Sequence, residues 1–429
     1  MTLLAMTCSI VWPLSSAGAL QPELDGIGSS YAAHAVEDWT FATIPSGLNL
    51  TYTSTSSDDG RGEFESYPSS GYDWATTDVP YGVDTQDSGP VVFPFDYVPI
   101  AGDGIELQYN IPGLTKTLQL SSAATCGLLT GAITNWDNPV IAADNPGVVL
   151  PNLAVVPVTE SDNAATSFTL ESYCISQQPA LWAAFANQLD TQPGGPPGSV
   201  PLSATTPYAA WPAITGGVSV TDTYDVHEGV GSTSGAIGAI QGSTEGQPGV
   251  PVASLLNASG EYTRPTEANI TSALAYATET AGQPVQLDFG AQGPNVYSLS
   301  TVSYLLLTTT ASAAYGAEMS AFVNFGMTTG QQVDLAFGYP TLGQTLEQFS
   351  LSEMEVLDGS VPETADELAA FPCGDLTPSE VAAGLTAPTC SNPGTGTPEA
   401  PYALALPLMG IAAFGGVVWV RRRRALRGP

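Results

Sequence analysis

The chain has 429 residues, of which 41 are acidic and only 8 are Lys or Arg, so its formal net charge is −33 at pH 7. Such a polyanion repels nucleic acid and anionic lipid, and we expect no nucleic-acid partner. Charged residues are only 11% of the sequence and hydrophobic residues 43%, which indicates a packed protein with an acidic surface rather than a disordered acidic chain.

The N-terminus is typical of a secretion signal in most respects. Residues 3–14 are an apolar run, and Ala17, Gly18 and Ala19 are small residues of the kind that a signal peptidase accepts. The usual positively charged start is missing from this segment, which leaves open an upstream start or a poor signal. We expect residues 1–19 to be a signal peptide and Leu20 to begin the mature chain.

Short strand-like and helix-like segments alternate after this signal. Strands are predicted at residues 48–53, 91–94, 153–158 and 302–308. Helices are predicted at residues 121–130, 165–176, 180–189, 267–278 and 314–324. This alternation predicts an α/β architecture in which helices flank sheets.

Four cysteines remain once Cys8 is removed with the signal: Cys126, Cys174, Cys373 and Cys390. An even number in an oxidising compartment favours disulfides, and three pairings are possible. We favour Cys126–Cys174 and Cys373–Cys390, because the second pair shares one short C-terminal segment. The chain has no CxxC spacing and only two histidines, so we expect no structural zinc site and no cofactor.

The C-terminus predicts a membrane anchor. Residues 359–402 lose periodicity and end in a Pro/Gly/Thr-rich stretch, which indicates a stalk. Residues 403–420 carry no charge, and at about 1.5 Å per residue a helix of this length spans roughly 27 Å, enough for a bilayer core. Arginines begin the tail at residues 421–429, and a basic cluster stays cytoplasmic. We predict a single-pass protein of the cell membrane with its ectodomain outside; a buried core helix is the alternative.

Residues 130–147, reading TGAITNWDNPVIAADNPG, resemble the phosphate-binding proteins of ABC transporters. In that family a G-x-I-T-x-W-x-D-P-x-I run precedes an N-P-G turn. The likeness covers roughly residues 22–345. Further landmarks follow in the family's order: a glycine-rich turn at 26–31, a second strand and its Ser/Gly-rich loop at 52–60, a D-x-P segment at 73–80, a G-A-I-G turn at 235–238 and a returning strand at 297–306.

The resemblance implies a type II periplasmic-binding-protein-like clamshell, in which two α/β lobes close over a ligand. The chain would cross between the lobes twice, so that lobe I is residues 20–105 with 299–358 and lobe II is residues 106–298. Free N–H groups at helix N-termini beside such a cleft favour an anion. Hinged closure of the two lobes would be the conformational event.

The resemblance also implies a set of ligand residues. Ser30 and Tyr31 match the first turn, Ser57 matches a serine of the second loop, and Asp78 matches an aspartate that accepts a hydrogen bond from protonated phosphate. Thr166 matches a hydroxyl in a fourth segment.

This fourth segment departs from the family pattern H-R-S-D-G-S-G-T-T-F, because the chain reads T-E-S-D-N-A-A-T-S-F from Thr159. Glu160 stands where the family has an arginine, Ala164 replaces a serine and Ala165 a glycine. A carboxylate about 4 Å from an anion costs on the order of 4 kcal/mol at an effective dielectric constant near 20. Either Glu160 faces the cleft, and the ligand is neutral, cationic or metal-bound, or it points to solvent and the cleft has lost its ligand.

Two functions follow from these observations. The first is a membrane-tethered solute-binding protein for phosphate or a related solute, with an ABC permease as partner. The alternative is a surface interaction protein that kept the clamshell and lost phosphate binding. We expect no enzyme, because a Ser-His-Asp site would need His34, inside a predicted helix, or His227, predicted at the surface, and no nucleophile elbow lies near either.

Overall fold

The computed structural model describes residues 23–83, 87, 89–190, 203–242, 249–331, 334 and 339–360. The predicted signal peptide, stalk, Cys373–Cys390 disulfide, transmembrane helix and basic tail lie outside the described residues. Within the described ranges, none of the helices is both long and apolar enough to span a bilayer.

The described strands form an eight-stranded sheet with the order β2-β1-β3-β11-β4-β8-β6-β7 and a three-stranded sheet with the order β10-β9-β5. The strands of the large sheet are β1 (Leu24–Gly28), β2 (Leu50–Ser54), β3 (Trp74–Thr77), β4 (Phe95–Tyr109), β6 (Val156–Glu160), β7 (Val218–Val220), β8 (Ala236–Gln241) and β11 (Ser300–Thr308). Those of the small sheet are β5 (Gln119–Leu120), β9 (Ser254–Leu256) and β10 (Tyr262–Thr263).

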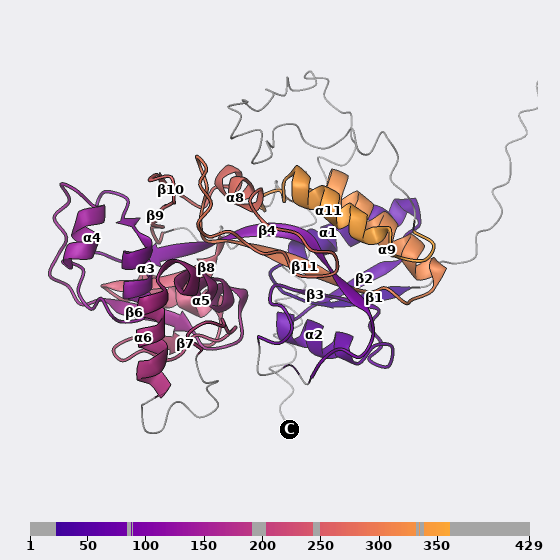
Figure 1. Cartoon of the computed structure of the whole chain (residues 1–429), viewed down its shortest axis with the longest axis horizontal. Helices are drawn as coiled ribbons and strands as arrows, with labels where there is room; N and C mark the ends of the chain where they lie inside the picture. The colour runs from indigo at the N-terminus through magenta and orange to yellow at the C-terminus, as the bar shows by residue number, and fades with distance from the viewer. Residues whose placement is uncertain are drawn as a thin grey trace, which may run out of the picture. The chain divides into compact units, whose positions relative to one another are not determined.

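Strand β4 belongs to both halves of the large sheet (Figure 1). Its residues 95–104 pair antiparallel with β11, whereas residues 105–109 pair antiparallel with β8. On the β11 side, β1 pairs parallel with β2 and β3. On the β8 side, β6 pairs parallel with β8 and β7. We call the strands from β2 to residue 104 of β4, with β11, the first half of the sheet, and the remainder the second half.

Helices cover both halves of the sheet. Those of the first half are α1 (Ala33–Thr43), α2 (Ser57–Glu65), α9 (Ala313–Phe325) and α11 (Gln344–Met354), with a π turn at Gly326–Gly330. Those associated with the second half are α3 (Ser122–Leu129), α4 (Pro139–Asp144), α5 (Ala165–Gln177), α6 (Pro179–Asp190) and α7 (Thr223–Ser232). Helix α8 (Glu267–Leu274) contacts β4 and β11. Figure 1 shows α1, α9 and α11 on one side of the first half and α2 on the other.

Local sequence signals set several of these boundaries. Ser56 caps α2 by accepting a hydrogen bond from the Asp59 backbone N–H at 3.1 Å, and Ser121 caps α3 in the same way. All nine residues of β11 are buried, as expected for a central strand covered on both faces. The core beneath the first-half helices includes Trp39, whose indole N–H donates to Asp334 Oδ1 at 3.0 Å.

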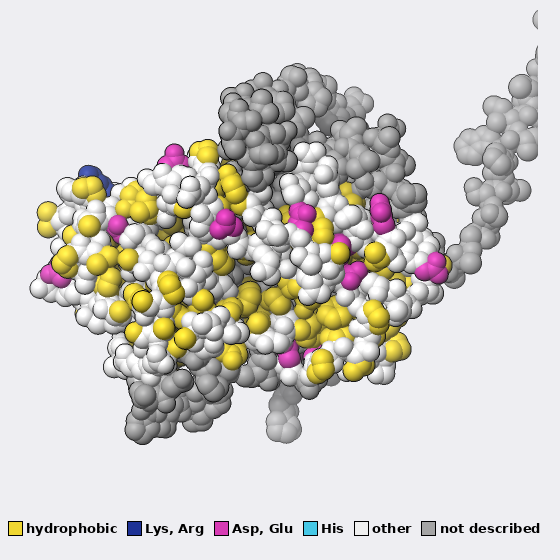
Figure 2. All heavy atoms as spheres, in the orientation of Figure 1, with side chains coloured by type: hydrophobic (Ala, Val, Ile, Leu, Met, Phe, Trp, Pro, Cys, Tyr) yellow, Lys and Arg dark blue, Asp and Glu magenta, His cyan; other side chains and the backbone are white. Residues whose placement is uncertain are grey.

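On the face drawn in Figure 2, acidic side chains are spread out rather than gathered in one patch.

Most of the predicted elements are present, with differences at their ends. The helices predicted at 121–130, 165–176, 180–189 and 314–324 are α3, α5, α6 and α9, and α8 is shorter than predicted. The strands predicted at 48–53 and 302–308 are β2 and β11, whereas β6 starts three residues later than the strand predicted from 153.

Three local predictions were wrong. Residues 91–94 form no strand, since Pro90 and Pro94 bracket them and proline has no N–H for a ladder. The loop predicted up to residue 60 is only two residues long, because the Ser56 cap starts α2 at Ser57. His227 is buried rather than at the surface, with Nδ1 2.8 Å from Gln108 Oε1.

The predicted disulfide between Cys126 and Cys174 is confirmed. It joins α3 to α5, with the two Cα atoms 5.8 Å apart and 48 residues of sequence separation. Both sulfurs lie in the core, where each cysteine has 0% exposure. The bond therefore ties together two helices that cover the second half of the sheet.

We expect the Cys126→Ala/Cys174→Ala variant to lose about 4 kcal/mol of unfolding free energy, the loop-closure value for a separation of 48 residues. Urea unfolding followed by circular dichroism measures this loss. Reductant breaks the disulfide of the wild type without removing the cysteine side chains, and it should lower the urea midpoint as the variant does. The Cys373→Ala/Cys390→Ala variant measures how much of the effect of reductant comes from the second pair. An unchanged midpoint in the first variant would contradict the prediction.

Candidate functional site

Asp78, which directly follows β3, is the centre of a buried hydrogen-bond cluster in the first half of the sheet. Its Oδ2 accepts hydrogen bonds from Ser29 Oγ at 2.6 Å and from Ser57 Oγ at 3.1 Å. Its Oδ1 accepts one from Ser303 Oγ at 2.5 Å. The side chain of Asp78 is buried, and the three serines come from the end of β1, the start of α2 and β11. Three separate elements therefore converge on one carboxylate.

Backbone groups hold these serines in place. Ser29 Oγ accepts the N–H of Tyr31 and that of Ala32, both at 3.1 Å, and Ser57 Oγ accepts the N–H of Asp78 at 2.9 Å. The chain turns at Gly28, whose φ is +143° and where an added Cβ would lie 2.1 Å from the Thr76 carbonyl oxygen. Only glycine allows β1 to approach β3 this closely.

The protonation of Asp78 reflects opposing influences. Burial raises the pKa of its carboxyl above the ordinary value, while the hydroxyls of Ser29, Ser303 and Ser57 and the charge of Arg61 act to lower it. Arg61 is itself fully buried. Its Nε lies 2.8 Å from Asp87, its Nη2 lies 3.0 Å from Asp58, and its Nη1 donates to Thr77 Oγ1 at 3.1 Å. This guanidinium is therefore engaged by the protein itself.

Glu160 ends β6 in the second half of the sheet and is also buried, with 8% of its surface exposed. Thr223 Oγ1, at the start of α7, lies 3.3 Å and 3.2 Å from its two carboxylate oxygens. Burial is the main cause that raises the pKa of Glu160 to about 7; Asp222 and Asp162 add to the increase, and the Thr223 hydroxyl opposes it. The solvent-facing alternative for Glu160 is thereby excluded.

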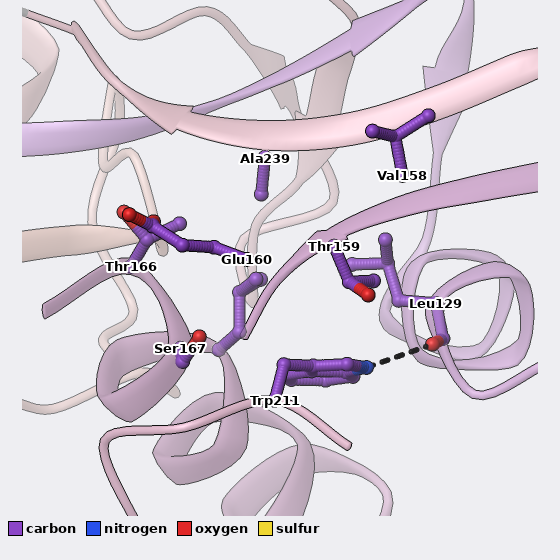
Figure 3. Close-up of a pocket in the computed structure, with 9 residues that line it drawn as sticks. Leu129, Val158, Thr159, Glu160, Thr166, Ser167, Trp211 and Ala239 are labelled. Atoms are coloured by element: carbon purple, nitrogen blue, oxygen red, sulfur yellow. Dashed lines mark hydrogen bonds between the residues drawn. The ribbon is translucent and has the colours of Figure 1, made fainter. Parts of the chain in front are cut away.

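Thr166 lies in the first turn of α5, close to Glu160. The N-cap residue Ala164 gives α5 no side-chain cap. Thr166 is 3% exposed, and within the described part of the chain its Oγ1 has no hydrogen-bond partner. Figure 3 shows the Glu160 side chain running toward Thr166. Both residues line one cavity, together with Leu129, Val158, Thr159, Ser167, Leu170, Trp211 and Ala239. At about 10 Å³, this cavity has room for about one water molecule.

The two halves of the site touch each other. Asn163 Nδ2 donates to Asp58 Oδ2 at 3.0 Å, which links the loop after β6 to the start of α2. Val79, next to Asp78, packs in one apolar cluster with Ala165 and Ala209. The structure thus brings Ser57 and Asp78 to the same junction as Glu160 and Thr166.

The first turn holds Ser30 and Tyr31, whose ligand roles stay predictions. Ser30 is exposed, while the adjacent Ser29 is the serine that bonds Asp78. The ring of Tyr31 lies 5.4 Å from that of Tyr339, and the backbone N–H of Tyr31 donates to Ser29 Oγ. Sequence reasoning also missed Ser303, which is 225 residues from Asp78. No sequence signal pointed to it, because all nine residues of β11 are buried. Ser303 reaches Asp78 by continuing the antiparallel register of β11 with β3, in which Tyr304 pairs with Thr77.

Comparison with known proteins places the chain in a family. Residues 15–329 match a family model described as a PBP superfamily domain. The chain belongs to this superfamily. The chain is similar to phosphate-binding protein PstS2 of Mycobacterium bovis (strain BCG / Pasteur 1173P2), at 28% identity over 39% of the chain and 45% of the relative. It therefore spans less than half the length of this relative.

Longer matches run at lower identity. Phosphate-binding protein PstS of Xylella fastidiosa (strain 9a5c) is 23% identical over 80% of the chain and 89% of the relative. That of Methanocaldococcus jannaschii is 24% identical over 62% of the chain and 68% of the relative. A solved phosphate-binding protein from Stenotrophomonas maltophilia has a TM-score of 0.52 at 15% identity, covering 82% of this chain and 99% of that one. This structural likeness shows the α/β binding-protein fold.

By their names, these relatives of the PBP superfamily are binding proteins rather than enzymes, in agreement with the sequence-based expectation. Within the described ranges, no group of three or more His, Cys, Asp and Glu side chains is placed to hold a metal ion. The buried carboxyls and hydroxyls of the junction can bind a ligand through hydrogen bonds and charge.

We expect Glu160→Gln to stabilise the protein at alkaline pH. The pKa of Glu160 is raised from 4.5 to about 7, so the folded state resists ionisation that the unfolded chain undergoes freely. Glu160 therefore lowers the stability of the wild type as pH rises from 4.5 to 7, and the variant lacks this contribution. Urea unfolding should show the variant more stable by about 3 kcal/mol near pH 8 and by about 1 kcal/mol near pH 5. Glu267→Gln, at an exposed position, is the control; an equal difference at both pH values would contradict the prediction.

Proposed function

We propose that the chain is an extracytoplasmic solute-binding protein that holds phosphate or a related solute between two lobes and delivers it to an ABC permease. The observation that carries this proposal is the Asp78 cluster facing the uncapped N-terminus of α5 across the junction. A carboxylate can accept a hydrogen bond from a ligand hydroxyl, and free helix N–H groups attract the ligand's anionic oxygens. The names of the phosphate-binding relatives support the same solute.

The division into lobes is part of this proposal. The change of partner along β4, from β11 at residue 104 to β8 at residue 105, supports a boundary near residue 105. The return of the chain through β11 supports a second boundary near residue 299. The first half of the sheet would then be lobe I and the second half lobe II, with hinge bending where β4 passes from one to the other.

The tether is also part of the proposal and rests on the sequence. An apolar helix at residues 403–420, followed by arginines, would hold the clamshell at the outer face of the cell membrane. Ligand exchange with a permease would then take place within reach of the anchor.

A second candidate function is a surface interaction protein that has lost its solute. Two observations favour it: Val79, Ala165 and Ala209 fill the junction with apolar contacts, and the cavity beside Glu160 has room for about one water molecule. A ligand the size of phosphate therefore requires the halves to separate.

Titration calorimetry of the full-length chain with phosphate distinguishes the two functions. The first predicts saturable binding near pH 6 and a loss on the order of 100-fold in Asp78→Asn, because an amide replaces the charged acceptor. Asp137→Asn, at an exposed loop position, is the matched control and should bind as the wild type does. Absence of heat in the wild type, together with absence of thermal stabilisation by phosphate, would favour the interaction protein.

A further inference from the structure

The two buried carboxylates of the junction differ in their hydrogen-bond partners. Asp78 accepts three hydroxyl groups, so its oxygens are held as acceptors. Among the described residues, Glu160 has one hydroxyl partner, Thr223, whose Oγ1 lies 3.3 Å and 3.2 Å from its two carboxylate oxygens. Burial disfavours a carboxylate charge unless donors or cations compensate. The structure therefore compensates the charge of Asp78 far better than that of Glu160.

The charged neighbours of Glu160 increase this difference. Asp222, the N-cap of α7, and Asp162, in the loop after β6, both disfavour ionisation of Glu160. The other cavity walls come from α3, β8, α5 and the Trp211 loop, and they present Leu129, Ala239, Thr166, Ser167 and Trp211, none of which is charged. Near and below neutral pH, Glu160 is therefore a neutral acid whose O–H is a hydrogen-bond donor.

We propose that the proton on Glu160 controls anion binding at this site: the neutral acid donates a hydrogen bond to a ligand oxygen, and its ionisation releases the anion. This inference rests on the proposed function and concerns the regulation of the same site. A protonated Glu160 donates a hydrogen bond to a ligand oxygen, as can the Thr166 hydroxyl in the same cavity, which has no partner among the described residues. Asp78, across the junction, accepts a ligand O–H. The ligand must therefore offer both acceptor oxygens and O–H groups.

The same geometry explains release at higher pH. An ionised Glu160 about 4 Å from an anionic oxygen weakens binding roughly 1000-fold at an effective dielectric constant near 20. The Val79, Ala165 and Ala209 contact must open for entry, after which the α5 N-terminus, which receives no side-chain cap from Ala164, is available to the ligand. The helix end then attracts the anion at either pH, so the proton on Glu160 decides between binding and release.

The experiment is calorimetric titration of the full-length chain with inorganic phosphate at about pH 5.5 and about pH 8, on either side of the Glu160 pKa. We expect the wild type to bind at least 30-fold more tightly at the lower pH. Glu160→Gln should show less than about tenfold difference between the two pH values, since a fixed amide donor replaces the titrating acid and only the second ionisation of phosphate itself remains. Glu267→Gln, at an exposed position, should follow the wild type.

Two further measurements make the outcomes distinct. Glu160→Arg places a guanidinium at this position and should bind phosphate at both pH values, and thermal unfolding checks that each variant folds. Sulfate, which carries no proton at either pH, should not bind the wild type. Equal pH dependence in the wild type and Glu160→Gln, or tight wild-type binding at both pH values, would overturn the inference while leaving phosphate binding intact. Absence of binding in the wild type and both Glu160 variants at either pH would instead overturn the proposed function.

Discussion

A carboxylate that is removed from water needs donors to replace its lost hydration, and Asp78 obtains them from Ser29, Ser57 and Ser303. These serines reach it only because β1, α2 and β11 end or pass at one place beside β3. The close approach of β1 to β3 at Gly28 and the cap that starts α2 at Ser57 are therefore conditions for the site as well as for the fold. The position of Asp78 therefore determines where the first half of the sheet gathers its buried hydrogen-bonding groups.

Glu160, in the second half of the sheet, is also a buried acid, but fewer hydrogen-bond donors replace its lost hydration. A family arginine at this position would bring a permanent charge, whereas Glu160 has one hydroxyl partner and two nearby aspartates that disfavour its own charge. Arg61 does not substitute for the missing cation, because its nitrogens bond Asp58, Asp87 and Thr77 within the first half. Among the described residues, the junction thus joins a buried acid with three hydroxyl donors to a buried acid with one, and burial raises the pKa of both carboxyls.

The sequence predicted those features that depend on contiguous motifs. The family, the α/β class and the Cys126–Cys174 pair all rest on local strings or short spacings. Ser303 could not be found this way, because it reaches Asp78 only through the pairing of β11 with β3, and the two residues are 225 positions apart in the sequence. His227 was misplaced for a related reason: its partner Gln108 belongs to β4, which is distant in sequence. The burial of Glu160 likewise comes from α5, α7 and the loop of Trp211 packing together, and no single segment shows it.

The contacts that close the junction limit how any ligand can be held. Asn163 bonds Asp58, and Val79 packs on Ala165 and Ala209, so the halves already meet through their own side chains. A solute must replace these contacts with stronger ones, and the replacement must include a partner for each buried acid. Asp78 can exchange serine hydroxyls for a ligand hydroxyl with little loss. Glu160 can donate a hydrogen bond to the ligand only while it is protonated. An ionised Glu160 repels the anion that the α5 N-terminus attracts. Occupancy of the junction and the proton on Glu160 are therefore linked, and closure without solute is the state favoured when that proton is lost.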